Sequence, residues 1–113
     1  MKAEKHRYIA FEIISRNNEI TEEILLKTIW NQLNIVYGEY GTSKIGLWLI
    51  YFNPERKKGV IRCSLTELDK LRTVLATITS FRKSKEPEVV INILGISGTI
   101  KTIKDKYFKD EAF

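Results

Sequence analysis

The sequence predicts an α+β fold in which one four-stranded antiparallel sheet carries two helices on the same face. Segments with apolar residues at every second position alternate along the chain with segments whose apolar residues recur at intervals of three and four. These are the periods of half-buried strands and of amphipathic helices. The chain has 113 residues, of which 43% are apolar. That is enough for one hydrophobic core, so residues 1–113 are expected to form one domain.

The first strand and the first helix are expected near the start of the chain. Residues 7–14 alternate between apolar and more polar side chains, which predicts a strand. Thr21 is the expected N-cap of the helix, because two glutamates follow it where the helix dipole favours carboxylates. The apolar stripe of this helix, which ends at Gly38, consists of Leu25, Ile29, Leu33 and Val36.

A hairpin is expected in the middle of the chain. Residues 37–43 contain two glycines and no apolar period, so we interpret them as a connection. Residues 44–52 contain the longest apolar run and predict a long strand, and residues 60–63 alternate again. The intervening residues 53–59 are turn-forming and basic, which predicts a hairpin with a basic tip.

The second helix is expected to begin at a capping box. Ser64 and Glu67 have the spacing at which the two side chains satisfy the first backbone donors of a helix reciprocally. Residues 82–87 end the pattern, because a proline follows a basic stretch. The core face of this helix consists of Leu68, Leu71, Leu75 and Ile78.

A last strand and a short helix complete the predicted fold. Residues 89–96 alternate, and Thr99 is the expected cap of a C-terminal helix that buries Ile100 and Ile103. The order is therefore strand, helix, strand, strand, helix, strand, followed by the C-terminal helix. This is the order of the ferredoxin-like, or RRM-like, α/β sandwich.

The two faces of the predicted sheet differ in composition. The side chains expected to face the helices are Ile9, Phe11, Ile13, Ile61, Cys63, Val89, Ile91 and Ile93. The outer face would then carry Tyr8, Ala10, Glu12, Val60, Arg62, Val90, Asn92 and Leu94. Glu12 is expected to pair with Arg62 across the strands. The outer face is semi-apolar and needs a cover, for which the C-terminal helix, a partner protein and stacked bases are the alternatives.

Composition excludes several classes of function. The longest apolar run is far shorter than a membrane span, and we expect a cytoplasmic protein. Cys63 and His6 are the only cysteine and histidine, so a zinc site is not expected, and structural roles are favoured for both. The carboxylates are scattered, without the clustering of a metal-dependent nuclease or a catalytic triad. The chain itself is therefore expected to be non-catalytic.

The formal charge of +5 is concentrated in basic clusters. Arg56, Lys57 and Lys58 occupy the predicted hairpin tip, where Arg62 and Lys44 are expected to join them. Lys101 and Lys104 share one face of the C-terminal helix. Such clusters suit phosphate backbones, because lysine and arginine release condensed counterions. A solvated turn and a plainly capped helix are the structural alternatives.

Four segments in this order resemble the ribonuclease P protein component 2 family. They are residues 7–13 (RYIAFEI), 37–41 (YGEYG), 53–63 (NPERKKGVIRC) and 96–101 (ISGTIK). The resemblance extends from about residue 6 to residue 108. It implies a ferredoxin-like subunit of the ribonucleoprotein that removes the 5′ leader from precursor tRNA, in which RNA carries the active site.

The resemblance also implies partners and site residues. The expected RNA contacts, to ribonuclease P RNA and precursor tRNA, are Arg7, Arg56, Lys57, Lys58, Arg62 and Lys101, and the charge pattern adds Lys44 and Lys104. The expected protein-contact segment, for ribonuclease P protein component 3 and other subunits, comprises Tyr37, Gly38, Tyr40 and Gly41. No cofactor is expected on this chain, since magnesium serves the RNA. Pairing of two copies, as a homodimer, is a further way to cover the outer face.

Two other function classes remain open from the sequence. A ferredoxin-like protein–protein adaptor without a nucleic-acid role would explain the semi-apolar face, but not the basic tip. A regulatory module that binds a small molecule between paired domains would tolerate the fold, and it also gives no reason for the tip.

Overall fold

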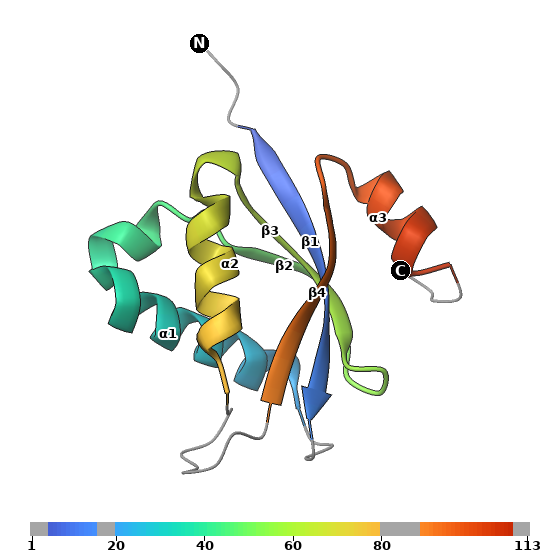
Figure 1. Ribbon diagram of the computed structural model, residues 1–113, viewed down its shortest axis with the longest axis horizontal. Helices are drawn as coiled ribbons and strands as arrows, with labels where there is room; N and C mark the ends of the chain where they lie inside the picture. Colours follow the sequence, from blue (N-terminus) through green and yellow to red (C-terminus); the bar gives the residue numbers. More distant parts are fainter. Residues whose placement is uncertain (1–4, 16–19, 80–88, 110–113) are drawn as a thin grey trace.

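In the part of the chain that the structure describes, four strands form one antiparallel sheet in the order β2-β3-β1-β4, and three helices lie on its two faces (Figure 1). The computed structural model describes residues 5–15, 20–79 and 89–109. The elements are β1 (His6–Ser15), α1 (Glu22–Ser43), β2 (Trp48–Asn53), β3 (Lys58–Ser64), a 3₁₀ turn (Leu65–Glu67), α2 (Leu68–Thr77), β4 (Val89–Ser97) and α3 (Ile100–Tyr107). The expected ferredoxin-like α+β architecture is confirmed.

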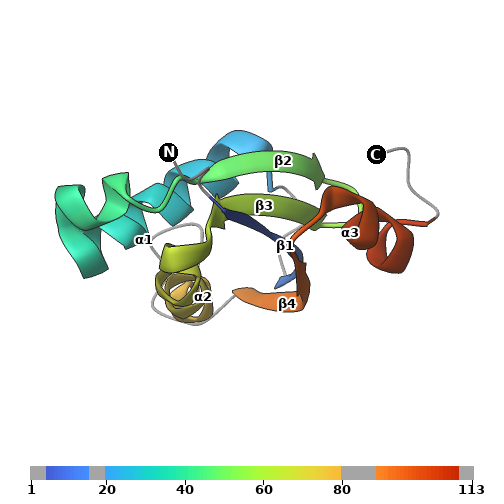
Figure 2. The same ribbon diagram turned by 90° about the horizontal axis from the view of Figure 1, so that it is seen from above.

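The main core lies between the sheet and the pair α1 and α2, which occupy one side of the sheet in both views (Figures 1 and 2). All eight side chains expected to face the helices belong to this core or pack against it. Period-two alternation therefore identified the inner face correctly, because strand pairing keeps alternate side chains on one side.

Helix α1 begins as expected and ends later than expected. The Thr21 side chain caps it by accepting a hydrogen bond from the Ile24 backbone N at 3.2 Å. Gly38, with φ 73°, interrupts the helical backbone, but the chain then resumes a helical course to Ser43. The prediction that residues 37–43 are a plain connection was wrong. Val36, which was placed on the core stripe, is exposed.

Strand β2 is shorter than the predicted strand 44–52. The chain turns at Gly46, where φ is 65°, and pairing begins only at Trp48. Ile45 and Leu47 are nevertheless buried in the core, and the Ser64 backbone N donates to the Ile45 carbonyl at 2.9 Å. The apolar run was therefore correct as a sign of burial but wrong as a measure of strand length.

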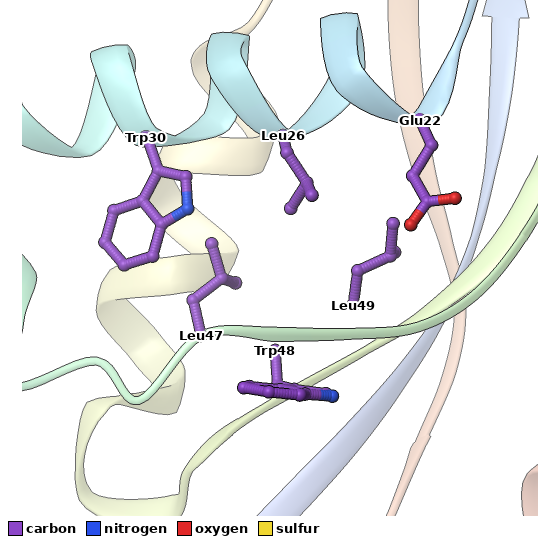
Figure 3. Close-up of a pocket in the computed structure, with 6 residues that line it drawn as sticks. All are labelled: Glu22, Leu26, Trp30, Leu47, Trp48 and Leu49. Atoms are coloured by element: carbon purple, nitrogen blue, oxygen red, sulfur yellow. The ribbon is translucent and has the colours of Figure 1, made fainter.

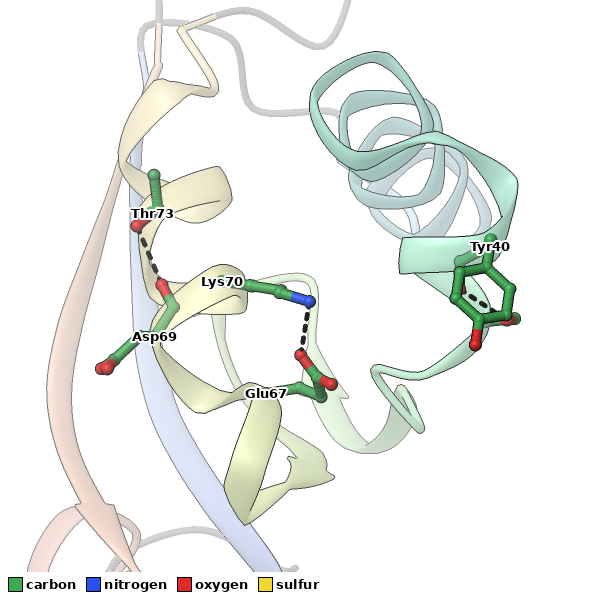
Figure 4. A network of polar contacts seen from close by, with 6 residues as sticks. Tyr40, Glu67, Asp69, Lys70 and Thr73 are labelled. Atoms are coloured by element: carbon green, nitrogen blue, oxygen red, sulfur yellow. Dashed lines mark hydrogen bonds and ion pairs between the residues drawn. The ribbon is translucent and has the colours of Figure 1, made fainter.

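The start of the second helix differs from the predicted capping box. Ser64 makes no side-chain cap bond, and a 3₁₀ turn precedes α2. Glu67 instead forms an ion pair with Lys70, whose Nζ lies 2.9 Å from the Glu67 carboxylate (Figure 4). The expected core residues Leu71, Leu75 and Ile78 are buried, as is Val74. The predicted helix end at residues 82–87 lies outside the described residues.

Helix α3 covers the centre of the outer sheet face. The Thr99 side chain caps α3, as expected, and accepts from the Thr102 backbone N at 3.4 Å. A second buried cluster under α3 consists of Ala10, Val60, Ile103 and Phe108. The sequence left three alternatives for covering the outer face. The structure shows that the C-terminal helix covers its centre.

Two register shifts interrupt the strand pairing in the sheet. One lies between Leu49 and Tyr51 in β2, and one lies opposite Ala10 and Phe11 of β1, where β4 carries the extra residue. Each shift breaks the alternation of side chains between the two faces of the sheet. The face of a residue beyond a shift therefore cannot be predicted from the period of two. The Tyr107 side chain packs directly on Gly95, which follows the second shift.

The predicted Glu12–Arg62 pair is absent, because the register sets Glu12 opposite Lys58 and Arg62 opposite Tyr8. The Glu12 Oε1 instead accepts a hydrogen bond from Asn92 Nδ2 at 3.0 Å.

Candidate nucleic-acid interface

The three cations of the hairpin tip differ in their exposure and in their contacts. Arg56 is exposed at the tip. Lys57 Nζ donates to Ser15 Oγ at 2.8 Å, and Lys58 Nζ donates to the Tyr107 carbonyl at 2.8 Å. These two side chains are half-buried and tie the tip to β1 and to the end of α3. Arg56 is thus the tip cation best placed to meet a phosphate.

The other two cations expected at the tip lie elsewhere. Arg62 is four residues along β3 from Lys58, or about 13 Å. Lys44 caps the far end of α1, with its Nζ 4.3 Å from the centroid of the Tyr40 ring. The predicted convergence was wrong because the tip and the start of β2 are opposite ends of the hairpin. The role of each cation in RNA contact stays a prediction.

The structure brings Arg62 into a different group, a row that crosses all four strands. Trp48, Arg62, Tyr8 and Ser97 pair successively along it. Trp48 lies between Leu47 and Leu49, which both pack into the main core, so its own side chain points to the outer face. Trp48 is 61% exposed, and the Arg62 guanidinium carbon lies 5.8 Å from the centroid of its ring.

Trp48 was not among the candidate site residues predicted from the sequence. The signal was present, because a tryptophan between two core leucines in a strand must point away from the core. It was obscured because the predicted strand began too early and its faces were not assigned.

Arg7, Lys101 and Lys104 lie near the connection between β4 and α3. The Arg7 guanidinium donates to the His6 carbonyl at 2.8 Å and lies against Gly98, where a Cβ would be 3.3 Å from the Arg7 Nη1. Lys101 is exposed on α3, and Lys104 is half-buried. The structure therefore places Arg7 beside the start of α3, whereas the tip residue Lys58 reaches the end of α3.

The predicted protein-contact segment divides into a packed part and an exposed part. Tyr37 packs against the main core, and Lys70 Nζ lies 5.6 Å from the centroid of its ring. Gly41 lies against the Tyr37 side chain. Tyr40 is exposed on the other side of the Gly38 bend (Figure 4). Ile35 and Val36, before the bend, are also exposed, so the distal part of α1 carries three exposed apolar side chains.

A hollow of about 260 Å³ lies between α1 and β2 (Figure 3). Leu26, Trp30, Leu47 and Leu49 point into the space between the two elements, with Glu22 at one end, whereas Trp48 points to the opposite side of β2. The volume is below the usual range for small-molecule sites, and Glu22 is the one charged side chain among these lining residues. The hollow gives little support to a small-molecule regulatory module.

The described residues offer few groups for metal binding or catalysis. They contain no cluster of three or more His, Cys, Asp or Glu residues that could hold a metal ion. None of the described helices is long and apolar enough to cross a bilayer. Cys63 is fully buried in the main core, as its place in an alternating strand predicted.

Burial gives Cys63 a testable pH signature, because it raises the pKa of the thiol from 9.0 to about 11. Below pH 9 the thiol is neutral in the folded and unfolded states, so its contribution to stability is complete. Above pH 9 the unfolded state loses the proton first. We therefore expect the free energy of unfolding to fall as pH rises toward 11, by up to about 2 to 3 kcal/mol.

Urea unfolding of the wild type and Cys63→Ala, below pH 9 and near pH 11, checks this expectation. Other groups titrate in this range, but they do so in both proteins. The wild type should lose more stability than the variant, and equal losses would contradict the assignment.

The fold and the arrangement of cations define a small basic domain of the ferredoxin-like class with a partly open sheet face. A family model described as the Rpp14/Pop5 family matches residues 7–108. The chain belongs to this family.

Curated relatives are similar in sequence to this chain over most of its length. The proteins named ribonuclease P protein component 2 from Pyrococcus horikoshii and Methanocaldococcus jannaschii are 39% and 38% identical to it over 104 residues. These matches cover 92% of this chain and 83% and 73% of the relatives. The protein of the same name from Methanosarcina mazei is 32% identical over 107 residues, covering 95% of this chain and 87% of the relative. The resemblance seen in the sequence is confirmed.

One solved structure shows the same fold at low identity. A chain in the cryo-EM structure of yeast ribonuclease MRP matches with a TM-score of 0.69 at 16% identity. The match covers 88% of this chain and 78% of that chain.

Proposed function

We propose that the chain is a non-catalytic, RNA-binding subunit of ribonuclease P that assists the catalytic RNA in removing the 5′ leader from precursor tRNA in the cytoplasm. The observation that carries the proposal is the family match over residues 7–108, with relatives named ribonuclease P protein component 2. The net charge of +5 supports contact with phosphates.

In this proposal the chain supplies position and positive charge. Arg56 at the tip and Lys101 on α3 are exposed, so each can approach a phosphate without breaking a packed contact. Arg7 and Arg62 lie at the opposite end of the sheet from the tip. Neutralising phosphates where RNA strands approach lowers the magnesium that the RNA needs to fold. The chain itself binds no cofactor, and the magnesium belongs to the RNA.

A protein partner has a candidate surface on the distal part of α1. Ile35 and Tyr40 are 77% and 76% exposed, and Val36 is also exposed. Exposed apolar side chains of this kind mark contact with another protein. We propose that another ribonuclease P protein, component 3 in the first instance, binds here. The same surface favours the protein–protein adaptor as the second candidate function.

Cleavage of precursor tRNA by reconstituted catalytic RNA at limiting magnesium, with component 3 present, tests the proposal. Adding this chain is expected to increase correct 5′ cleavage. Arg56→Ala is expected to weaken RNA binding and to reduce the salt slope by about one phosphate contact, with an unchanged melting temperature. Lys57 and Lys58 are less suitable probes, because their packed contacts mix binding with stability.

Lys27→Ala is the matched control, because it removes an exposed cation from α1 outside the expected contact set. It should change the salt slope less than Arg56→Ala does. Failure of a folded wild-type sample to stimulate cleavage, beside a competent control subunit, would contradict the subunit proposal and leave the adaptor.

A further inference from the structure

The outer face of the sheet is open beyond α3, at the end where β2 begins. Helix α3 covers Ala10 and Val60, but Trp48 remains 61% exposed. Trp48 is thus an exposed indole on a sheet face, although tryptophan usually buries most of its area. Its orientation is fixed, because the flanking leucines are held in the core on the other side of β2 (Figure 3).

The Arg62 guanidinium favours a negatively charged group beside the Trp48 ring. Its guanidinium lies over the Trp48 ring, with 5.8 Å from the guanidinium carbon to the ring centroid. Its Nε is buried and has no hydrogen-bond partner among the described residues. A buried donor without an acceptor is costly, so a turn of the guanidinium toward an arriving acceptor would relieve that cost. Arginine meets phosphate oxygens in a planar, two-pronged geometry.

The surroundings of the pair favour an anionic ligand. The row contains Trp48, Arg62, Tyr8 and Ser97, and none of these side chains is acidic. Along β1 the first carboxylate is Glu12, four residues from Tyr8 or about 13 Å away. That carboxylate already accepts a hydrogen bond from Asn92.

We propose that Trp48 and Arg62 bind one nucleotide of a single-stranded RNA segment, the base stacking on the Trp48 ring and a phosphate accepting from the Arg62 guanidinium. This inference rests on the proposed RNA-binding function and names the form of RNA and the residues that receive it. Stacking tolerates any base, because every base has a π face, so the pair selects for unpaired RNA and not for sequence.

Binding of a short single-stranded oligouridylate, followed by fluorescence anisotropy, tests the pair. Trp48→Ala is expected to weaken binding by roughly five- to a hundredfold, the range for loss of one base–aromatic stack. Trp48→Phe should keep most of the affinity, because it keeps a ring. Arg62→Gln should weaken binding and reduce the salt slope by about 0.7, the value for one single-strand phosphate contact.

Val90→Ala is the matched control, because Val90 is an apolar residue of the same sheet face with 59% exposure and lies on the other edge strand. It should bind the oligonucleotide like the wild type. Thermal melting of each variant separates lost binding from lost folding.

The fluorescence of Trp48 gives a second, direct measurement of contact with the ring. In a Trp30→Phe protein, Trp48 is the only remaining tryptophan, since the chain has two. The oligonucleotide should quench its fluorescence at saturation and protect it from iodide. No change in fluorescence at a concentration that saturates anisotropy would overturn the proposal.

The outcomes separate this inference from the proposed function. If Trp48→Ala binds the oligonucleotide as tightly as the wild type, the inference fails, even when the chain stimulates precursor cleavage. If Trp48→Ala instead loses only its association with component 3, the pair is a protein contact and the inference also fails. If the wild type stimulates no cleavage but binds single strands through Trp48, the subunit proposal fails and the nucleotide site stands.

Discussion

Replacing Leu71 by alanine is expected to lower the free energy of unfolding by about 2 to 5 kcal/mol. Leu71 is fully buried in the main core, on the face of α2 that meets the sheet. Truncation removes apolar contacts and leaves a cavity that a packed sheet and helix fill only in part. Urea denaturation monitored by circular dichroism measures the change.

The adjacent residue supplies the control for Leu71. The Arg72 side chain is 54% exposed, and its NH1 lies 4.0 Å from the Asp69 carboxylate. Exposed pairs of this kind contribute little, so Arg72→Ala should change the stability by less than about 0.5 kcal/mol. A loss at Leu71 as small as that at Arg72 would refute the assignment of the buried face of α2.

Replacing Gly95 by alanine is expected to displace α3 from the sheet and to cost about 1 to 3 kcal/mol. A Cβ at Gly95 would overlap the Tyr107 side chain, which lies directly on it. Relief requires Tyr107 to move, and Tyr107 is the last residue of α3. Hydrogen exchange of the α3 amides measures the displacement, with urea denaturation for the free energy.

A second substitution makes the Gly95 prediction specific. Adding Tyr107→Ala to Gly95→Ala removes the overlapping ring, so the double variant should lose less stability than the sum of the two single variants. Gly98→Ala is the control, because its Cβ would meet only the far end of the long Arg7 side chain, at 3.3 Å. Strict additivity at 95 and 107 would show that the overlap is not the cause.

Features set by nearby residues could be predicted from the sequence. The caps at Thr21 and Thr99 were correct because the hydroxyl and the amide that it satisfies are three residues apart. The inner face of β1 was correct because alternation depends only on the pleat. The capping box at Ser64 failed because its side chain turns inward and is almost completely buried, where tertiary packing overrides local preference.

Features set by distant residues could not be predicted. Lys58 belongs by composition to a solvated basic tip, but its Nζ reaches the Tyr107 carbonyl, 49 residues later in the chain. The apolar period of α1 placed Val36 in the core, but Val36 is exposed. The distal end of α1 projects beyond the strands (Figure 2). The exposed Trp48 depends on where β2 begins, which the turn at Gly46 decides.

The position of β1 in the sheet has a consequence for how the protein is made. Strand β1 is inserted between β3 and β4, so Tyr8 pairs with Ser97 on one side and with Arg62 on the other. Pairing over such separations makes folding slow, because long loops must close before the contacts form. A chain growing on the ribosome therefore carries β1 with one open edge until β4 has emerged. Completion of synthesis, and not early helix formation, sets when that strand becomes protected from aggregation.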